Sequence, residues 1–122
     1  MVLEAQNEAI KMIRPGITFS DLDKKTTEVI TKAGFKRYIQ HGVSHPVGLD
    51  VHDVSSGDTL RPGMVITVEP GLYIPLDDKN LPPAYHGFGI RIEDDILVTG
   101  DGYENLSIDV PKDPAIIERR MK

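Results

Sequence analysis

The 122-residue sequence contains no cysteine and no tryptophan, and aromatic residues make up only 6% of it. Without cysteine the protein can form neither a disulfide bond nor a thiolate metal site. Lys and Arg number 14 against 19 Asp and Glu, and the net charge is −5. A nucleic-acid-binding domain would usually show a basic face instead. No apolar run approaches the roughly 20 residues that span a bilayer, and no signal-peptide pattern is present. These absences predict a cytoplasmic protein that binds neither nucleic acid nor a membrane.

The first third of the chain predicts two helices within one domain covering residues 1–122. Apolar positions recur at helical spacing over residues 1–13, and Arg14-Pro15-Gly16 ends that segment. The second helix is expected to begin at Ser20 as its N-cap, because acidic residues follow directly and favour the positive end of a helix. Gly34 is expected to end this helix as its C-terminal capping glycine.

Beyond Gly34 the apolar period changes from helical spacing to alternation. Short β-branched runs predict strands at 65–69, 89–93, 96–98 and 105–108. Asp113-Pro114 then opens a terminal helix, with Asp as the cap and Pro at the first helical position. Two helices, a run of strands and a last helix predict an α+β fold in which helices pack on an antiparallel sheet.

Three of the four histidines, His41, His45 and His52, lie within thirteen residues. Imidazole can bind a metal, carry a proton or donate a hydrogen bond near neutral pH. Glu69 and Glu93 lie in predicted strands, where a buried carboxylate costs free energy unless a cation compensates it. Each glutamate taken alone is more typical of a solvated face. Together with His45 they form an oxygen-rich ligand set suited to Mn²⁺, Co²⁺, Fe²⁺ or Zn²⁺.

Four motifs in a fixed order make the sequence similar to a known family. They are His-Gly-x-Ser-His, Gly-Leu-Asp-Val-His-Asp, Pro-Gly-Met-Val-x-Thr-Val-Glu-Pro-Gly-Leu-Tyr and Gly-Ile-Arg-Ile-Glu-Asp-Asp. The chain resembles the C-terminal catalytic part of the pita-bread metallopeptidases. Among these, Xaa-Pro aminopeptidases (aminopeptidase P) are the most similar and Xaa-Pro dipeptidases (prolidases) come next. The resemblance implies the second αβ half of a pita-bread fold and hydrolysis of peptides with proline in second position.

The resemblance also implies a two-metal site, commonly of manganese, with two aspartates, one histidine and two glutamates as ligands. His45, Glu69 and Glu93 match the histidine and the two glutamates. Glu69 is then placed to take a proton from the attacking water, since it is both a ligand and a neighbour of that water. His41 and His52 match two histidines that line the substrate pocket and donate hydrogen bonds to the reacting carbonyl.

Arg91 has two interpretations. By resemblance it pairs with Tyr73 and steadies an aspartate ligand, but it is equally suited to a simple ion pair with Glu93 on one strand face. Asp50 and Asp53 flank His52 in a turn, where acidic residues are usually structural. The resemblance gives His86 no role, and we expect it at the surface.

The two aspartate ligands of the family lie upstream of the part that this chain resembles, and no aspartate precedes Asp21. We therefore expect a C-terminal half without the upstream half and the N-terminal domain, with little or no peptidase activity alone. A surface left uncovered in this way favours self-association, and we expect a homodimer. A non-catalytic peptide- or protein-binding module is the alternative, but it would not need three ligand-type residues in these positions.

Overall fold

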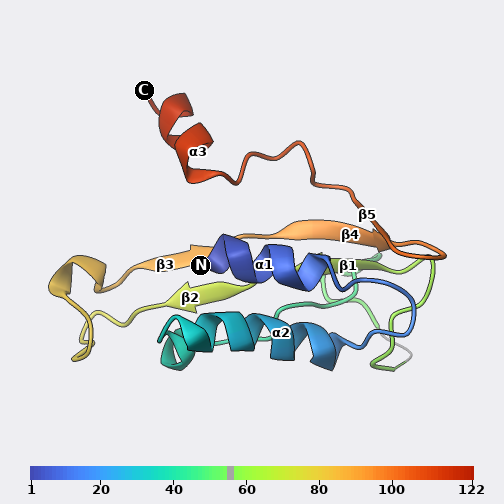
Figure 1. The fold of residues 1–122 in the computed structure, drawn as a ribbon, viewed down its shortest axis with the longest axis horizontal. Coiled ribbons are helices and arrows are strands. Elements are labelled where there is room, and N and C mark those ends of the chain that lie inside the picture. The colour runs from blue at the N-terminus through green and yellow to red at the C-terminus, as the bar shows by residue number, and fades with distance from the viewer. Residues whose placement is uncertain (55–56) are drawn as a thin grey trace.

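The computed structural model describes residues 1–54 and 57–122. In chain order the elements are α1 (Val2–Ile10), α2 (Phe19–Lys32), η1 (Lys36–Tyr38), β1 (Val65–Val68), β2 (Gly71–Tyr73), η2 (Pro83–Tyr85), β3 (Gly89–Arg91), β4 (Asp94–Val98), β5 (Tyr103–Asn105) and α3 (Pro114–Arg120). Helices η1 and η2 are single 3₁₀ turns. The α+β fold class with antiparallel strands is confirmed (Figure 1).

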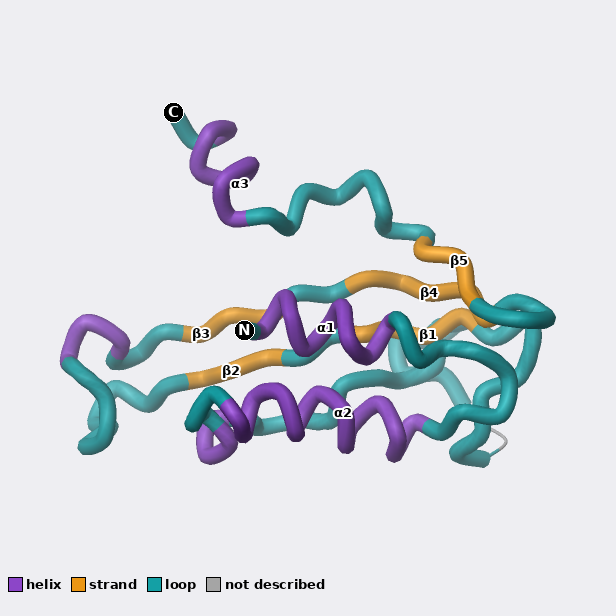
Figure 2. Tube along the Cα trace, in the orientation of Figure 1, coloured by secondary structure: helices purple, strands orange, loops and turns teal. Residues whose placement is uncertain are grey.

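The strands form one long antiparallel ribbon with a break in its middle. Strand β1 pairs with β4, with Val68 opposite Asp94, and β2 pairs with β3, with Gly71 opposite Arg91. Both pairings have the same register, so the ribbon continues across the break, where Ile92 N donates to Pro70 O at 3.4 Å. Strand β5 adds to the other edge of β4. Figure 2 shows the two halves of the ribbon in line.

Helices α1 and α2 lie side by side along this ribbon (Figure 1). The apolar face that the spacing predicts for the first helix is buried throughout, from Val2 to Ile13. One part of the core joins α1 to β1 and β4 through Ile10, Ile66 and Ile96. Burial of such branched side chains stabilises the fold by about 1.5–3 kcal/mol each. The helices therefore support the strands that flank the two glutamates, Glu69 directly after β1 and Glu93 directly before β4.

Several element boundaries differ from those that the sequence predicts. Glu69-Pro70-Gly71 resembles the end of a strand, but the chain resumes its pairing at once as β2, which the sequence analysis missed. The last strand is 103–105, not 105–108, and 106–110 form turns and bends. The strand expected at 89–93 ends at Arg91, and the one expected at 65–69 ends at Val68. The strand expected at 96–98 begins two residues earlier, at Asp94. The first helix ends at Ile10, three residues early.

The N-cap of α2 is Thr18, and the prediction of Ser20 was wrong. The Thr18 hydroxyl accepts from Asp21 N at 3.0 Å, and the Asp21 carboxylate accepts from Thr18 N at 3.1 Å. This reciprocal arrangement is a capping box with aspartate in place of the usual glutamate. The predicted cap of the last helix is correct: Asp113 accepts from Ala115 N at 2.8 Å.

Within the described residues, no helix is both long and apolar enough to cross a membrane. The last helix, α3, stands apart from the two other helices, beyond the β4 edge of the ribbon (Figure 1). A buried ion pair between Lys112 Nζ and Asp94 Oδ1, 2.7 Å apart, anchors the segment that leads to it.

Replacement of Thr18 by alanine tests the capping box. Thr18→Ala should lower the free energy of unfolding by about 1 kcal/mol, because it leaves Asp21 N without its partner. Ser20→Ala is the matched control and should change stability by less than about 0.5 kcal/mol, since Ser20 is exposed in the first turn. Urea unfolding followed by circular dichroism measures both. A larger loss in Ser20→Ala than in Thr18→Ala would contradict the assignment.

Candidate functional site

The histidine-bearing segment 43–47 runs antiparallel to β1 and is held there by main-chain hydrogen bonds. Glu69 N donates to Val43 O at 2.7 Å, Thr67 N to His45 O at 2.9 Å, and Val47 N to Val65 O at 2.9 Å. Residues opposite one another in such a pair point to the same face. His45 therefore lies beside Thr67, on the face that also presents Glu69.

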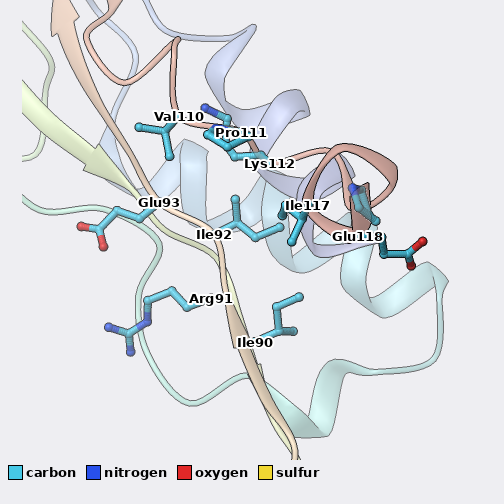
Figure 3. A pocket seen from close by; sticks show the side chains of 10 residues that line it. Ile90, Arg91, Ile92, Glu93, Val110, Pro111, Lys112, Ile117 and Glu118 are labelled. Carbon is cyan, nitrogen blue, oxygen red and sulfur yellow. The ribbon is translucent and has the colours of Figure 1, made fainter. Parts of the chain in front are cut away.

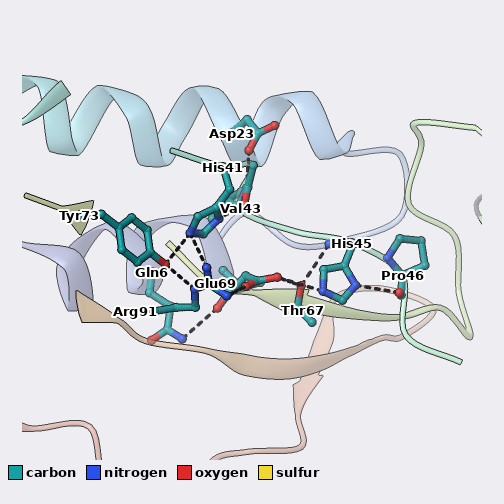
Figure 4. Close-up of polar contacts among 12 residues, drawn as sticks. Gln6, Asp23, His41, Val43, His45, Pro46, Thr67, Glu69, Tyr73 and Arg91 are labelled. Atoms are coloured by element: carbon teal, nitrogen blue, oxygen red, sulfur yellow. Dashed lines mark hydrogen bonds and ion pairs between the residues drawn. The ribbon is translucent and has the colours of Figure 1, made fainter. Parts of the chain in front are cut away.

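Helix α2 holds the other end of this segment in place. The Asp23 carboxylate accepts a hydrogen bond from Val43 N at 2.7 Å. A side chain added at Gly42 would lie 3.7 Å from the same carboxylate, which is ordinary contact. Asp23 therefore ties the start of the histidine segment to the helix layer, as Figure 4 shows.

The structure brings the three predicted metal ligands together. His45, Glu69 and Glu93 each present one ligand atom, and these atoms all lie within 4.8 Å of one another. The register of the ribbon places Glu69 opposite Glu93, and two like charges directly opposite in a sheet repel. Burial, followed by the charges of Glu69 and Asp95, raises the pKa of the Glu93 carboxyl. A cation between the two carboxylates would relieve this repulsion.

The hydrogen bonds of His45 also fit a cation. Its Nδ1 lies 3.0 Å from Pro46 O, and a carbonyl can only accept, so Nδ1 carries a hydrogen. Nε2 of the neutral ring then has a lone pair, which faces Glu69 Oε1 at 3.0 Å. Two acceptors face each other unless a proton or a metal ion lies at Nε2. A histidine that donates its other ring N–H to a carbonyl is the usual form of a metal ligand.

Glu69 is the buried member of the group, with 6% of its surface exposed. Three side chains contact its carboxylate. Thr67 Oγ1 donates to Oε1 at 3.2 Å, His45 Nε2 lies 3.0 Å from the same oxygen, and Arg91 Nη1 lies 3.3 Å from Oε2. The ion pair that Arg91 makes is thus with Glu69, so the Glu93 ion pair considered from the sequence is corrected. The cross-strand register, which local spacing does not reveal, decides between these partners.

Arg91, Tyr73 and His41 form a second group next to Glu69 (Figure 4). Arg91 Nε donates to Tyr73 Oη at 2.6 Å, and Arg91 Nη2 lies 3.1 Å from His41 Nε2. Hydrogen bonding to Tyr73 raises the pKa of the Arg91 guanidinium. The pairing of Arg91 with Tyr73 that the resemblance implies is therefore present in the geometry.

The same contacts assign the hydrogens of His41. A guanidinium can only donate, so His41 Nε2 accepts and Nδ1 carries the hydrogen, which it donates to Gly42 O at 2.8 Å. Gly71 leaves room for this group, because a Cβ there would lie 2.6 Å from Tyr73 Oη and 2.9 Å from His41 Nε2. Any larger residue would displace the two rings.

His52 lies on the open side of the site. Its ring is 4.2 Å from the ring of His45, centroid to centroid. Asp53 next to it is structural, as expected: its carboxylate accepts from Leu49 N at 2.9 Å and closes the turn. A cavity of about 430 Å³ is lined by five of the six predicted residues and two small neighbours: His41, Gly42, Ser44, His45, His52, Glu69 and Arg91. Glu93, the sixth, is not among its lining residues.

Two residues of this site were missed by the sequence analysis. The first is Thr67, whose hydroxyl joins Glu69 to the His45 main chain. Ser44 lines the cavity, and its buried hydroxyl has no hydrogen-bond partner among the described residues. Strand alternation back from Glu69 would have indicated Thr67.

His86, expected at the surface, is half-buried. Its Nε2 lies 2.9 Å from Leu81 O, and this contact holds the loop before β3.

A second, largely apolar groove of about 490 Å³ lies on the other side of β3 (Figure 3). In Figure 3, Ile90 and Ile92 point towards Ile117 of α3, while Arg91 and Glu93 point the opposite way. Strand β3 thus has one face on the candidate metal site and the other on this groove.

Comparisons with known proteins agree with this geometry. Metallopeptidase family M24 matches residues 1–100. The Xaa-Pro aminopeptidase of Escherichia coli is 43% identical over 130 residues, which cover 98% of this chain and 28% of that protein. The structure of E. coli aminopeptidase P with the inhibitor Pro-Leu superposes with a TM-score of 0.86 at 38% identity, covering 98% of this chain and 32% of that one. The zinc-substituted enzyme in complex with product gives 0.85 at 38% identity, with the same coverage.

The chain thus spans about a third of the length of the proteins that it matches. The predicted family is confirmed, because the match extends over most of the chain and includes every residue of the cavity. The family match and the cluster of ligand-type residues in the ribbon agree. This chain belongs to metallopeptidase family M24.

Proposed function

We propose that this chain supplies three ligands of a divalent metal centre, His45, Glu69 and Glu93, in an Xaa-Pro aminopeptidase. The observation that supports it best is the position of Glu69 opposite Glu93, with His45 Nε2 within 4.8 Å of a carboxylate oxygen of each. Two carboxylates and one imidazole suit a hard or borderline divalent cation. We propose Mn²⁺ as the physiological metal, and Co²⁺, Fe²⁺ and Zn²⁺ have compatible ligand preferences.

When bound, the metal would polarise the substrate carbonyl. It would also lower the pKa of a bound water molecule towards neutrality, so that hydroxide is available near neutral pH. Glu69 is suited to hold the proton of that water, since its carboxylate is buried and oriented by Thr67 and Arg91. The substrates are peptides with proline in second position, and the bond cleaved is the one before that proline.

His52 is better placed than His41 to donate a hydrogen bond to the reacting carbonyl oxygen. Both ring nitrogens of His41 are engaged, with Gly42 O on one side and with Tyr73 and Arg91 on the other. Among the described contacts, the ring nitrogens of His52 make no hydrogen bond, and the ring is exposed at the mouth of the cavity. We therefore assign oxyanion stabilisation to His52 and orientation of Arg91 to His41.

A cytoplasmic location for the protein stays a prediction from the composition.

Metal uptake by this chain tests the ligand assignment. Glu93→Gln should weaken Mn²⁺ binding at least tenfold relative to the native chain, because the substitution removes one charged ligand and leaves the shape unchanged. Free Mn²⁺ can be followed by electron paramagnetic resonance during titration. Glu104→Gln, at an exposed position of β5, is the matched control and should bind like the native chain. Equal binding by Glu93→Gln and the native chain, or none by the native chain, would contradict the assignment.

A chimera tests the activity. The matching segment of E. coli Xaa-Pro aminopeptidase is replaced by this chain, and hydrolysis of an Xaa-Pro peptide is measured. We expect turnover that a chelator abolishes, and a loss of roughly a hundredfold or more in the same chimera with Glu93→Gln. The 122-residue chain alone should show little or no turnover, because three ligands hold metal less well than five. A folded chimera without activity would contradict the proposed function.

We also propose that the isolated chain self-associates. Its C-terminal segment exposes large apolar side chains, with exposed fractions of 69% for Ile108, 56% for Val110 and 81% for Met121. Contiguous exposed apolar surface tends to be buried by association. Light scattering at increasing concentration should give the mass of a homodimer. A constant monomer mass at high concentration would overturn this proposal.

A further inference from the structure

Thr67 has a buried hydroxyl at the centre of the candidate metal site. The residue is 2% exposed and lies on β1, two positions before Glu69, so both side chains point to one face. Its Oγ1 lies 3.1 Å from His45 N and 3.2 Å from Glu69 Oε1. The hydroxyl therefore contacts the main chain of one proposed ligand and the carboxylate of another.

The direction of both hydrogen bonds follows from the groups involved. The His45 main-chain N–H can only donate, so Thr67 Oγ1 accepts from it. An ionised carboxylate can only accept, so Thr67 must use its single hydroxyl hydrogen on Glu69 Oε1. The Thr67 main-chain N–H donates to His45 O at 2.9 Å as well. Thr67 thus bonds to His45 twice and to Glu69 once.

These bonds restrict a side chain that is otherwise free to turn. The terminal torsion of a glutamate is broad and nearly two-fold, so packing alone does not determine where its oxygens lie. In this site Oε1 takes the hydrogen of Thr67 and faces His45 Nε2 at 3.0 Å, while Oε2 faces Arg91 Nη1 at 3.3 Å. Thr67 thus holds one oxygen of the carboxylate and Arg91 holds the other.

We propose that Thr67 is a positioning residue, whose hydroxyl sets the orientation of the Glu69 carboxylate relative to His45 Nε2 for metal binding. The inference rests on the proposed function, since the bound cation is the one proposed there. Groups that orient metal ligands typically change affinity ten- to a hundredfold when they are removed. A purely structural threonine, favoured in a strand by its β-branched shape, would change stability without changing affinity.

Two substitutions distinguish the effect of the Thr67 hydroxyl from the effect of its side-chain shape. Thr67→Val keeps the β-branched shape and removes the hydroxyl, whereas Thr67→Ser keeps the hydroxyl and removes the methyl group. We expect Thr67→Val to weaken Mn²⁺ binding about ten- to a hundredfold in electron paramagnetic resonance titrations, and Thr67→Ser to remain within about threefold of the native chain. Thr26→Val removes another buried hydroxyl, one bonded to Leu22 O within α2, and should leave the affinity unchanged.

A second measurement, on the metal-free chain, separates this inference from the proposed function. Hydrogen exchange of the His45 amide should accelerate at least tenfold in Thr67→Val and stay near native in Thr67→Ser, because only the valine variant lacks the acceptor. If the native chain binds no Mn²⁺, the proposed metal centre fails, and exchange at His45 alone decides whether Thr67 positions the segment. Native-like Mn²⁺ affinity in folded Thr67→Val, or unchanged exchange at His45, would overturn the inference.

Discussion

The candidate site depends on the main-chain pairing of segment 43–47 with β1. This pairing makes β1 an inner strand, with the histidine segment on one edge and β4 on the other. His45 thereby reaches Glu69 from one side, and the β1–β4 register brings Glu93 from the other. Asp23 anchors the start of the segment to α2. The ligand-type side chains converge because three stretches of backbone are hydrogen-bonded in register, on a layer supported by two helices.

Convergence of these groups has an electrostatic consequence. Glu69 and Glu93 face each other, and His45 Nε2 faces a carboxylate oxygen at 3.0 Å. Arg91 offsets one negative charge through its contact with Glu69, while the pKa of Glu93 stays raised. Two carboxylates held this close, with Glu69 buried and Glu93 exposed, repel each other without a compensating cation. The arrangement is therefore better suited to a divalent ion than to a purely structural network, and this supports the enzyme over the binding module.

Strand alternation and motif spacing were sufficient to predict His45, Glu69 and Glu93 as one group. Local pattern did not predict the features that depend on pairing between distant segments. Pro70 resembles a strand end, yet the ribbon continues past it because the Pro70 carbonyl still accepts from Ile92 N. The partner of Arg91 and the role of Thr67 follow from the cross-strand register, which no short motif encodes. The cap at Thr18 was missed because Asp21 replaces the glutamate of the usual capping box.

The central claim is that His45, Glu69 and Glu93 form one metal-binding point. Anomalous diffraction at the manganese edge, from crystals grown with Mn²⁺, tests it most directly. We expect a peak at about 2.0–2.2 Å from His45 Nε2 and from one oxygen of each glutamate, the range for nitrogen and oxygen ligands of zinc. We also expect that the direct contact between His45 Nε2 and Glu69 Oε1 is replaced by coordination of both atoms to the metal. A strong peak elsewhere on the chain, with that contact intact at 3.0 Å, would contradict it.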